Sequence, residues 1–198
     1  MTPEDILPTY NAVAEIWDRD RNQSLFERKW LDRMLNHAPG KRVLDMGCGT
    51  GRPIASYLSE RRADVTGLDG AAAMIPLFQK NLPGARAILA DMRGLDLGEK
   101  FDAILAWNSF FHLAPDDQRA MFAVFARHAA PGAALMFTSG PEQGERIGDV
   151  ADHMVYHASL ASTEYENLLN ENGFKVKHFR PEDPECAGHT IWLAQFTS

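Results

Sequence analysis

The sequence predicts an α/β fold: a doubly wound, seven-stranded, mainly parallel sheet with an antiparallel C-terminal strand, preceded by two N-terminal helices. Two observations lead to this prediction. Five short apolar runs alternate with helical stretches between residues 42 and 138, and two further runs follow near the end of the chain with no helix between them. Of the 198 residues, 45% are hydrophobic and 24% are charged, which suits one core, so we expect a single domain over residues 1–198.

Two helices are expected before the first strand. Apolar residues from Tyr10 to Trp17 recur at positions i, i+3, i+4 and i+7, the spacing of one helical face. A second helix should begin at Ser24, where the run Ser-Leu-Phe-Glu has the form of a capping box, and should end before Gly40. We expect residues 1–40 to form a helical cover in which Tyr10 and Trp17 face a bound ligand.

The central strands are expected at residues 42–46, 64–69, 85–90, 101–106 and 133–138. Each is a short apolar run, and a stretch long enough for a helix separates most of these runs from the next. Connections of this kind are crossovers between parallel strands, and they place helices on both faces of the sheet.

The rest of the chain should contain a long irregular stretch, one helix and a hairpin. Residues 139–160 show no clear period and exceed most connections in length, so we expect a lid-like insertion. A helix should run from Thr163 to a stop at Gly173. The runs 174–180 and 190–196 are joined by a loop with no room for a crossover helix, so these strands should pair antiparallel.

Charge and composition limit the partners. Lys and Arg number 20 against 27 Asp and Glu, giving a formal net charge of −7. A field of this sign repels polyphosphate, so we expect a small-molecule partner rather than nucleic acid. No apolar run approaches the roughly 20 residues that cross a bilayer, no basic-then-apolar leader is present, and two cysteines make no disulfide framework. We expect a cytoplasmic protein without a membrane or metal site; its oligomeric state stays open.

The most informative motif is the run from Val43 to Gly51, a strand followed by three alternate glycines and a helix. Glycines there let the backbone turn sharply and approach a nucleotide-like ligand, with helix N-terminal amides exposed. A dinucleotide motif requires a further glycine where this chain has Arg52. Asp45, at the end of the strand, would repel a pyrophosphate but attract a cationic group. The expected ligand is therefore partly cationic.

This run resembles the signature Asp-x-Gly-x-Gly-x-Gly of the class I S-adenosylmethionine-dependent methyltransferases, matched at every fixed position from Asp45 to Gly51. The resemblance covers roughly residues 40 to 198 and implies S-adenosyl-L-methionine as cofactor. It also implies a seven-stranded sheet with an antiparallel last strand. One departure is Pro76, which falls in the helix expected after the second strand, so that helix should be kinked or start later than in the family.

The resemblance assigns further residues one by one. Asp69 stands where the family binds both ribose hydroxyls, Gly70 to Met74 would line the adenine, and Asp91-Met92 would contact its amino group and ring. Ala106, Trp107 and Asn108 occupy positions whose backbone meets the methionine moiety. Together with the cover, the expected cofactor residues are Tyr10, Trp17, Asp45, Gly47, Cys48, Gly49, Gly51, Asp69, Gly70, Met74, Asp91, Met92, Ala106, Trp107 and Asn108.

The implied reaction is methyl transfer to a small-molecule acceptor by one-step in-line displacement, with the methylated atom, oxygen, nitrogen or sulfur, left open. The run from Phe101 to Leu113 looks like small-molecule members, and it lacks the Asn/Asp-Pro-Pro-Tyr/Phe motif of enzymes that methylate DNA bases or glutamine. If the acceptor must lose a proton, His112, Tyr156 and His157 are the candidate bases.

Two other functions stay open from the sequence. One is a non-catalytic methyltransferase-like binding module, which the intact cofactor residues disfavour. The other is a nicotinamide-dependent oxidoreductase, which Arg52 and the antiparallel end of the sheet disfavour.

Overall fold

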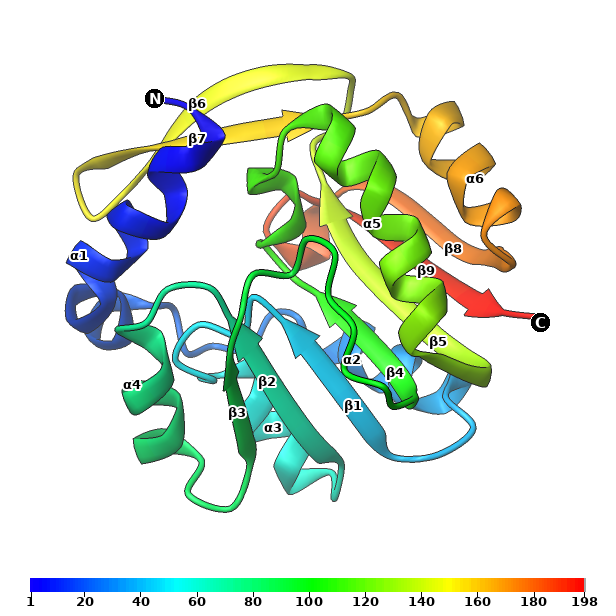
Figure 1. Cartoon of the computed structure of the whole chain (residues 1–198), viewed down its shortest axis with the longest axis horizontal. Coiled ribbons are helices and arrows are strands. Elements are labelled where there is room, and N and C mark those ends of the chain that lie inside the picture. The colour runs from blue at the N-terminus through cyan, green and yellow to red at the C-terminus, as the bar shows by residue number, and fades with distance from the viewer. Residues whose placement is uncertain (198) are drawn as a thin grey trace.

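A seven-stranded sheet forms the centre of the computed structural model, which describes residues 1–197 (Figure 1). Its strand order is β3-β2-β1-β4-β5-β9-β8. The strands are β1 (Arg42–Met46), β2 (Asp64–Asp69), β3 (Arg86–Leu89), β4 (Phe101–Ala106), β5 (Ala129–Ser139), β8 (Phe174–Asp183) and β9 (His189–Phe196). The first five run parallel, and β9 pairs antiparallel with both β5 and β8. The predicted fold class is confirmed, including its antiparallel C-terminal strand.

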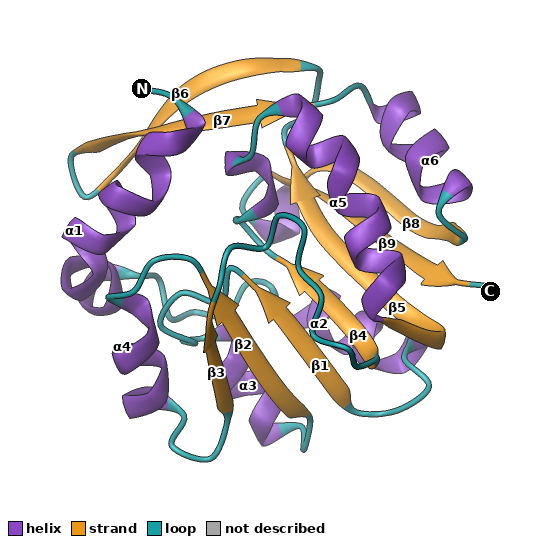
Figure 2. Cartoon of the chain, viewed as in Figure 1, coloured by secondary structure: helices purple, strands orange, loops and turns teal. Residues whose placement is uncertain are grey.

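Helices cover both faces of the sheet (Figure 2). They are α1 (Ile6–Asp20), α2 (Arg28–His37), α3 (Ile54–Glu60), α4 (Met74–Asn81), α5 (Pro115–His128) and α6 (Ser162–Glu171). Successive side chains of a strand point to opposite faces. In β1, Leu44 shares a core with Phe122 of α5 and Tyr165 of α6, whereas Val43 shares a second core with Leu31 of α2. The sheet is therefore doubly wound.

The start of α2 differs from the sequence prediction. The helix begins at Arg28 and not at Ser24, so the predicted start is wrong. Leu25 adopts a φ of 54°, which no helix contains. The Glu27 side chain is fully buried and pairs with Arg21, so it does not reach back to the backbone of Ser24 as a capping box requires. An ion pair with Arg21, six positions earlier, has taken the place of the cap.

The helix after β2 starts late and is not interrupted. It begins at Met74, which places Pro76 in its first turn. An N–H in the first turn has no partner within the helix, so proline costs no hydrogen bond there.

Residues 139–160 contain a β-hairpin that the sequence pattern missed. Strand β6 (Gly144–Val150) pairs antiparallel with β7 (His153–Ser159). The two residues between them, Ala151 and Asp152, both have positive φ, 48° and 63°. Two-residue hairpin turns of this kind are normally signalled by Asn-Gly or Asp-Gly, and Ala-Asp gives no such signal. The expectation of an irregular stretch is therefore wrong.

The hairpin and α1 lie at the same edge of the sheet, beyond the carboxyl ends of the central strands (Figure 1). They pack on each other through an apolar cluster that joins Ile6 and Val13 to Val155 and Tyr156. By contrast, α2 packs against the sheet face with α3. Of the predicted N-terminal cover, only α1 and the 3-10 turn before it, Pro3–Asp5, lie over this edge.

Candidate functional site

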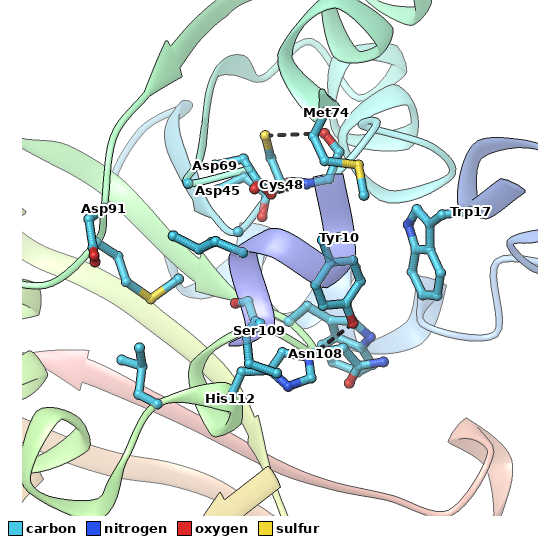
Figure 3. Close-up of a pocket in the computed structure, with 18 of the residues that line it drawn as sticks. Tyr10, Trp17, Asp45, Cys48, Asp69, Met74, Asp91, Asn108, Ser109 and His112 are labelled. Atoms are coloured by element: carbon cyan, nitrogen blue, oxygen red, sulfur yellow. Dashed lines mark hydrogen bonds between the residues drawn. The ribbon is translucent and has the colours of Figure 1, made fainter. Parts of the chain in front are cut away.

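A pocket lies between α1 and the carboxyl ends of β1, β2 and β4 (Figure 3). This is where ligands bind in open α/β sheets. Ala106 is fully buried at the end of β4 and does not line the pocket. All the other expected cofactor residues do line it: Tyr10, Trp17, Asp45, Gly47, Cys48, Gly49, Gly51, Asp69, Gly70, Met74, Asp91, Met92, Trp107 and Asn108.

The glycine-rich turn after β1 needs its glycines for two different reasons. Gly47, Gly49 and Gly51 all have positive φ, between 54° and 80°. A Cβ on Gly47 would lie 2.2 Å from the Cβ of Ser109, and one on Gly51 would lie 2.5 Å from Cδ1 of Leu82. A Cβ on Gly49 would have the Nε1 atom of Trp17 as its nearest neighbour, at 3.5 Å. The first and third glycines therefore permit close packing, whereas the second keeps the pocket open.

Two carboxyl groups lie side by side at the base of the pocket: Asp45 is buried and Asp69 is half-buried (Figure 3). Asp69 accepts hydrogen bonds of 2.8 Å from the amides of Gly49 and Ala71. Burial raises the pKa of Asp69, and these amides oppose the rise. Burial and the charge of Asp69 raise the pKa of Asp45 to about 7. Two such groups favour a ligand that carries positive charge.

Side chains of α1 close the pocket from above. The rings of Tyr10 and Trp17 meet edge to face, with centroids 6.0 Å apart. Leu7 lies over Gly70, where an added Cβ would come within 2.8 Å of its Cδ2 atom. Arg21, at the end of α1, has its guanidinium carbon 5.8 Å from the centre of the Trp17 ring.

His112 is buried at the pocket wall, and its tautomer follows from its partners. Nδ1 lies 2.8 Å from the backbone carbonyl oxygen of Tyr156, which can only accept, so Nδ1 carries the hydrogen. Nε2 therefore accepts, and it lies 3.0 Å from the Tyr10 hydroxyl, which donates to it. Burial, aided by His157, lowers the pKa of His112 to about 4. At neutral pH the ring presents a lone pair toward α1.

The other two candidate bases do not line this pocket. Tyr156 supplies its carbonyl to His112, while its side chain is buried in the apolar cluster with α1. The ring centre of His157 lies 4.8 Å from that of His112 and 4.7 Å from that of Phe111. His157 lines a neighbouring cavity together with Phe111, Ser139 and Ser159. The rings of His112, His157 and Phe111 therefore lie between the two cavities.

The far end of the pocket carries Asp91 and Met92, after β3. Arg93 donates to both oxygens of Asp91 and also pairs with Asp117 at the start of α5. Burial alone would raise the pKa of Asp91, but its hydrogen bonds with Arg93 bring it below the usual value. The carboxylate is thus held in one orientation at the pocket wall.

Several residues at the pocket escaped the sequence analysis. The sequence does not point to Arg21 and Arg93, because an arginine on a surface helix or loop is normally exposed to solvent. The apolar contributors near the N-terminus precede the periodic part of α1. The full set is Pro3, Ile6, Leu7, Arg21, Arg52, Ile54, Arg93, Ser109 and Leu113. Ser109 had one usable signal, its position directly after the expected cofactor residues that follow β4.

Among residues 1–197, no helix combines the length and the apolar character needed to cross a bilayer. The same part of the chain contains no group of three or more His, Cys, Asp or Glu side chains placed to hold a metal ion.

Comparison with known proteins agrees with this geometry. A family model described as a methyltransferase domain matches residues 43–132, the segment with the glycine-rich turn, Asp69 and Asp91. An O-methyltransferase of Pyrenophora dematioidea is 28% identical over 166 residues, which are 74% of this chain and 61% of that protein. The dTDP-3-amino-3,4,6-trideoxy-alpha-D-glucopyranose N,N-dimethyltransferase of Streptomyces venezuelae is 33% identical over 155 residues, 69% of this chain and 65% of that protein. The chain spans less than two thirds of the length of each.

A solved structure shares the fold over nearly the whole chain. It is an amino pentose methyltransferase of Micromonospora echinaspora with S-adenosylmethionine bound, which superposes with a TM-score of 0.72 at 23% identity and covers 93% of this chain and 95% of that one. The motif from Asp45 to Gly51 lies at the same edge of the sheet as Asp69, in a seven-stranded sheet that has the antiparallel last strand implied by the resemblance. The chain therefore has the fold of the class I S-adenosylmethionine-dependent methyltransferases, and its residues 43–132 match the methyltransferase domain model.

Proposed function

We propose that the protein transfers a methyl group from S-adenosylmethionine to a small-molecule acceptor. One observation carries the proposal: the buried Asp45 and the half-buried Asp69 lie beside the glycine-rich turn in one pocket. A carboxyl pair of this kind suits a ligand that bears a sulfonium and an ammonium group, and it would repel the pyrophosphate of a nicotinamide cofactor. The residues present therefore fit S-adenosylmethionine.

Each part of the cofactor has a matching group on the pocket wall. Asp69 keeps lone pairs for the two ribose hydroxyls beyond the two amides that it already accepts. Asp91 and Met92 would meet the adenine. Asp45 would attract the methionyl ammonium group, and Arg21 supplies a cation for the methionyl carboxylate. With Gly49 open to the cavity, the backbone can approach the ligand closely.

Methyl transfer from a sulfonium requires the side chains mainly to position the reactants. When bound, S-adenosylmethionine supplies a methyl group on a positively charged sulfur. The chain must hold the acceptor in line with that methyl and keep water out, which is the role we assign to α1 and the hairpin of β6 and β7. His112 presents its Nε2 lone pair at the wall, where it can accept a hydrogen bond from an acceptor N–H or O–H after Tyr10 moves aside.

The acceptor pocket is expected between residues 139–160 and the loop from Trp107 to His112. The cavity lined by Phe111, Ser139, Ser159 and His157 lies in this region and mixes one aromatic wall with polar groups. Such a mixture is typical of small-molecule sites. The relatives named above act on amino sugars or carry the name O-methyltransferase, so an amine and a hydroxyl are the acceptor groups to test first.

Two measurements test the proposal. Calorimetric titration should show that the protein binds S-adenosylmethionine, with NAD titrated in parallel. Incubation with methyl-labelled S-adenosylmethionine and a panel of small amines, phenols, hydroxylated sugars and thiols should then identify a labelled product. Binding of NAD in place of S-adenosylmethionine would contradict the cofactor assignment. Binding without transfer to any acceptor, together with a stoichiometric protein partner in a pull-down, would favour a binding module.

A further inference from the structure

Asn108, at the pocket wall after β4, is held by a chain of hydrogen bonds from two distant strands. It has a positive φ of 51°, which favours glycine and is uncommon for other residues. Its backbone N–H donates to the Thr138 hydroxyl at 2.9 Å, and that hydroxyl donates to the Asn108 side-chain oxygen at 3.1 Å. Thr138 is fully buried in β5. The left-handed backbone is therefore held from one side by a single threonine.

The other side of Asn108 is held by His189, the first residue of β9. Nδ1 of His189 lies 2.8 Å from the carbonyl oxygen of Cys186, so Nδ1 carries the hydrogen and Nε2 carries the lone pair. The Asn108 side-chain nitrogen lies 3.0 Å from Nε2 and donates to it. The two bonds together decide which way the amide faces, because Thr138 donates to its oxygen while His189 accepts from its nitrogen.

The imidazole of His189 is itself fixed by two aromatic rings. Its centre lies 5.4 Å from that of Trp107, with an interplanar angle of 26°, and 5.5 Å from that of Phe26, with an angle of 30°. Trp107 also lines the pocket. Contact with two aromatic rings restricts rotation of the imidazole, so its Nε2 atom stays directed at Asn108.

We infer that His189 is a positioning residue for cofactor binding: as the neutral Nδ1–H tautomer it orients the Asn108 amide toward the methionyl part of the ligand. The inference rests on the proposed function, because the ligand is the proposed cofactor. Asn108 keeps one side-chain N–H and one oxygen lone pair beyond its bonds to Thr138 and His189. If the amide turns over, these two groups exchange places at the pocket wall.

Protonation of His189 would have that effect. The protonated ring is a donor at both nitrogens, so Nε2 would face a donor amide and Asn108 would have to turn, losing its bond from Thr138. The groups that act on the ring are Glu27 and Arg21, together with the carbonyl of Cys186. Burial lowers the pKa of His189, which Cys186 and Glu27 oppose and Arg21 reinforces. The ring should therefore stay neutral at pH 7 and take up a proton only below pH 6.5.

Two variants separate the hydrogen bond from the stacking. His189→Gln places an amide oxygen near the position of Nε2 but removes the ring, whereas His189→Phe keeps a ring in contact with Phe26 and Trp107 but removes the acceptor. We expect His189→Gln to bind S-adenosylmethionine within about threefold of the parent and His189→Phe to bind about tenfold more weakly. Thr138→Ser and Thr138→Val form a second matched pair. The serine variant keeps the hydroxyl and should bind within about threefold of the parent, whereas the valine variant loses it and should bind about tenfold more weakly. Thermal unfolding of each variant checks that it is folded.

Two readouts do not depend on turnover. The ratio of parent to His189→Gln affinities should fall as the pH is lowered below 6.5, because only the parent has a residue at position 189 that takes up a proton. Nitrogen-15 NMR of the imidazole at pH 7.5 should show a protonated Nδ1 and an unprotonated Nε2. Equal binding by His189→Phe and the parent, or a protonated Nε2, would overturn the inference. Failure of the parent itself to bind S-adenosylmethionine would instead count against the proposed function.

Discussion

The hydroxyl of Tyr10 donates a 3.0 Å hydrogen bond to Nε2 of His112, although the two residues are 102 positions apart in the chain. This bond joins α1 to the loop after β4 across the mouth of the pocket. Since His112 is bound at its other nitrogen to the carbonyl of Tyr156, α1, the loop after β4 and the hairpin meet at one imidazole. A ligand that enters below α1 must either keep this arrangement or replace it.

Exchange of α1 amides should therefore respond to the cofactor. We expect amides of residues 8–22 to be more protected from hydrogen exchange when S-adenosylmethionine is present, because Tyr10 and Trp17 would then cover a filled pocket. Amides of α6, which lies on the far part of the sheet, serve as the internal reference. Unchanged protection of α1 under saturating ligand would refute the covering role.

The pKa of Asp45 predicts a pH dependence of binding. Burial and the charge of Asp69 raise the pKa of Asp45 from its ordinary value of 3.8 to about 7. Below pH 7 a cationic ligand must displace a proton, so the affinity for S-adenosylmethionine should weaken by up to about tenfold for each pH unit, and should level off above pH 7. Calorimetry in buffers of different ionisation enthalpy measures the released proton. Asp45→Asn should bind more weakly and show a much flatter profile.

The same group predicts how stability changes with pH in the ligand-free protein. Between about pH 4 and pH 7 folded Asp45 keeps a proton that the unfolded chain has released, so its contribution to the free energy of unfolding falls as pH rises through that window. Above pH 7 the penalty is constant. Asp45→Asn should remove it and raise the melting temperature at pH 8 relative to the parent. A lower melting temperature for the variant at pH 8 would mean that the buried carboxylate has a stabilising partner.

Loss of Asp69 should abolish tight cofactor binding. Asp69→Ala leaves the ribose hydroxyls without a charged acceptor, a loss of roughly 1.5–3 kcal/mol per bond, and also frees the amides of Gly49 and Ala71. Calorimetric titration measures the affinity, and circular dichroism checks the fold. Asp64→Ala, at the exposed start of the same strand, is the matched control and should bind like the parent. Parental affinity in a folded Asp69→Ala protein would show that the ribose lies elsewhere.

Alanine substitutions at the three glycines of the turn should have different effects on cofactor affinity and on stability. Gly49→Ala should weaken S-adenosylmethionine binding at least tenfold with a modest loss of stability, because its Cβ would enter the cavity near Trp17. Gly47→Ala and Gly51→Ala should instead lower the melting temperature sharply, since their Cβ atoms would collide with Ser109 and Leu82. Gly84→Ala, which meets nothing within 4 Å, is the control. The reverse ranking of melting temperatures would contradict this assignment.

Substitutions in the acceptor region should lower methyl transfer without weakening cofactor binding. His112→Ala, Tyr156→Phe and His157→Ala should each keep the affinity for S-adenosylmethionine within about threefold, under roughly 0.7 kcal/mol, while at least one lowers methyl transfer tenfold or more. His112→Ala should have the largest effect, because only its imidazole reaches the cofactor pocket. If all three turn over the identified acceptor at the parental rate, or lose the cofactor instead, the acceptor site lies elsewhere.

The sequence by itself determined the order of the elements and the cofactor end of the pocket. Alternating apolar runs place Asp45, Asp69 and Asp91 at successive strand ends, and parallel strands bring such ends to one edge whatever the details of packing. The antiparallel last strand followed from loop length alone. These features rest on local spacing and on chain connectivity, both of which can be read along one chain.

Only the tertiary structure decided what closes the pocket. The hairpin of β6 and β7 has no turn signal in its sequence, and the start of α2 was moved by the ion pair of Glu27 with Arg21. Likewise, nothing local to Asn108 reveals that Thr138 and His189 orient it. The partners of Asn108 are 30 and 81 positions away in the chain, and a hydrogen bond between distant residues forms only where folding has already brought them together.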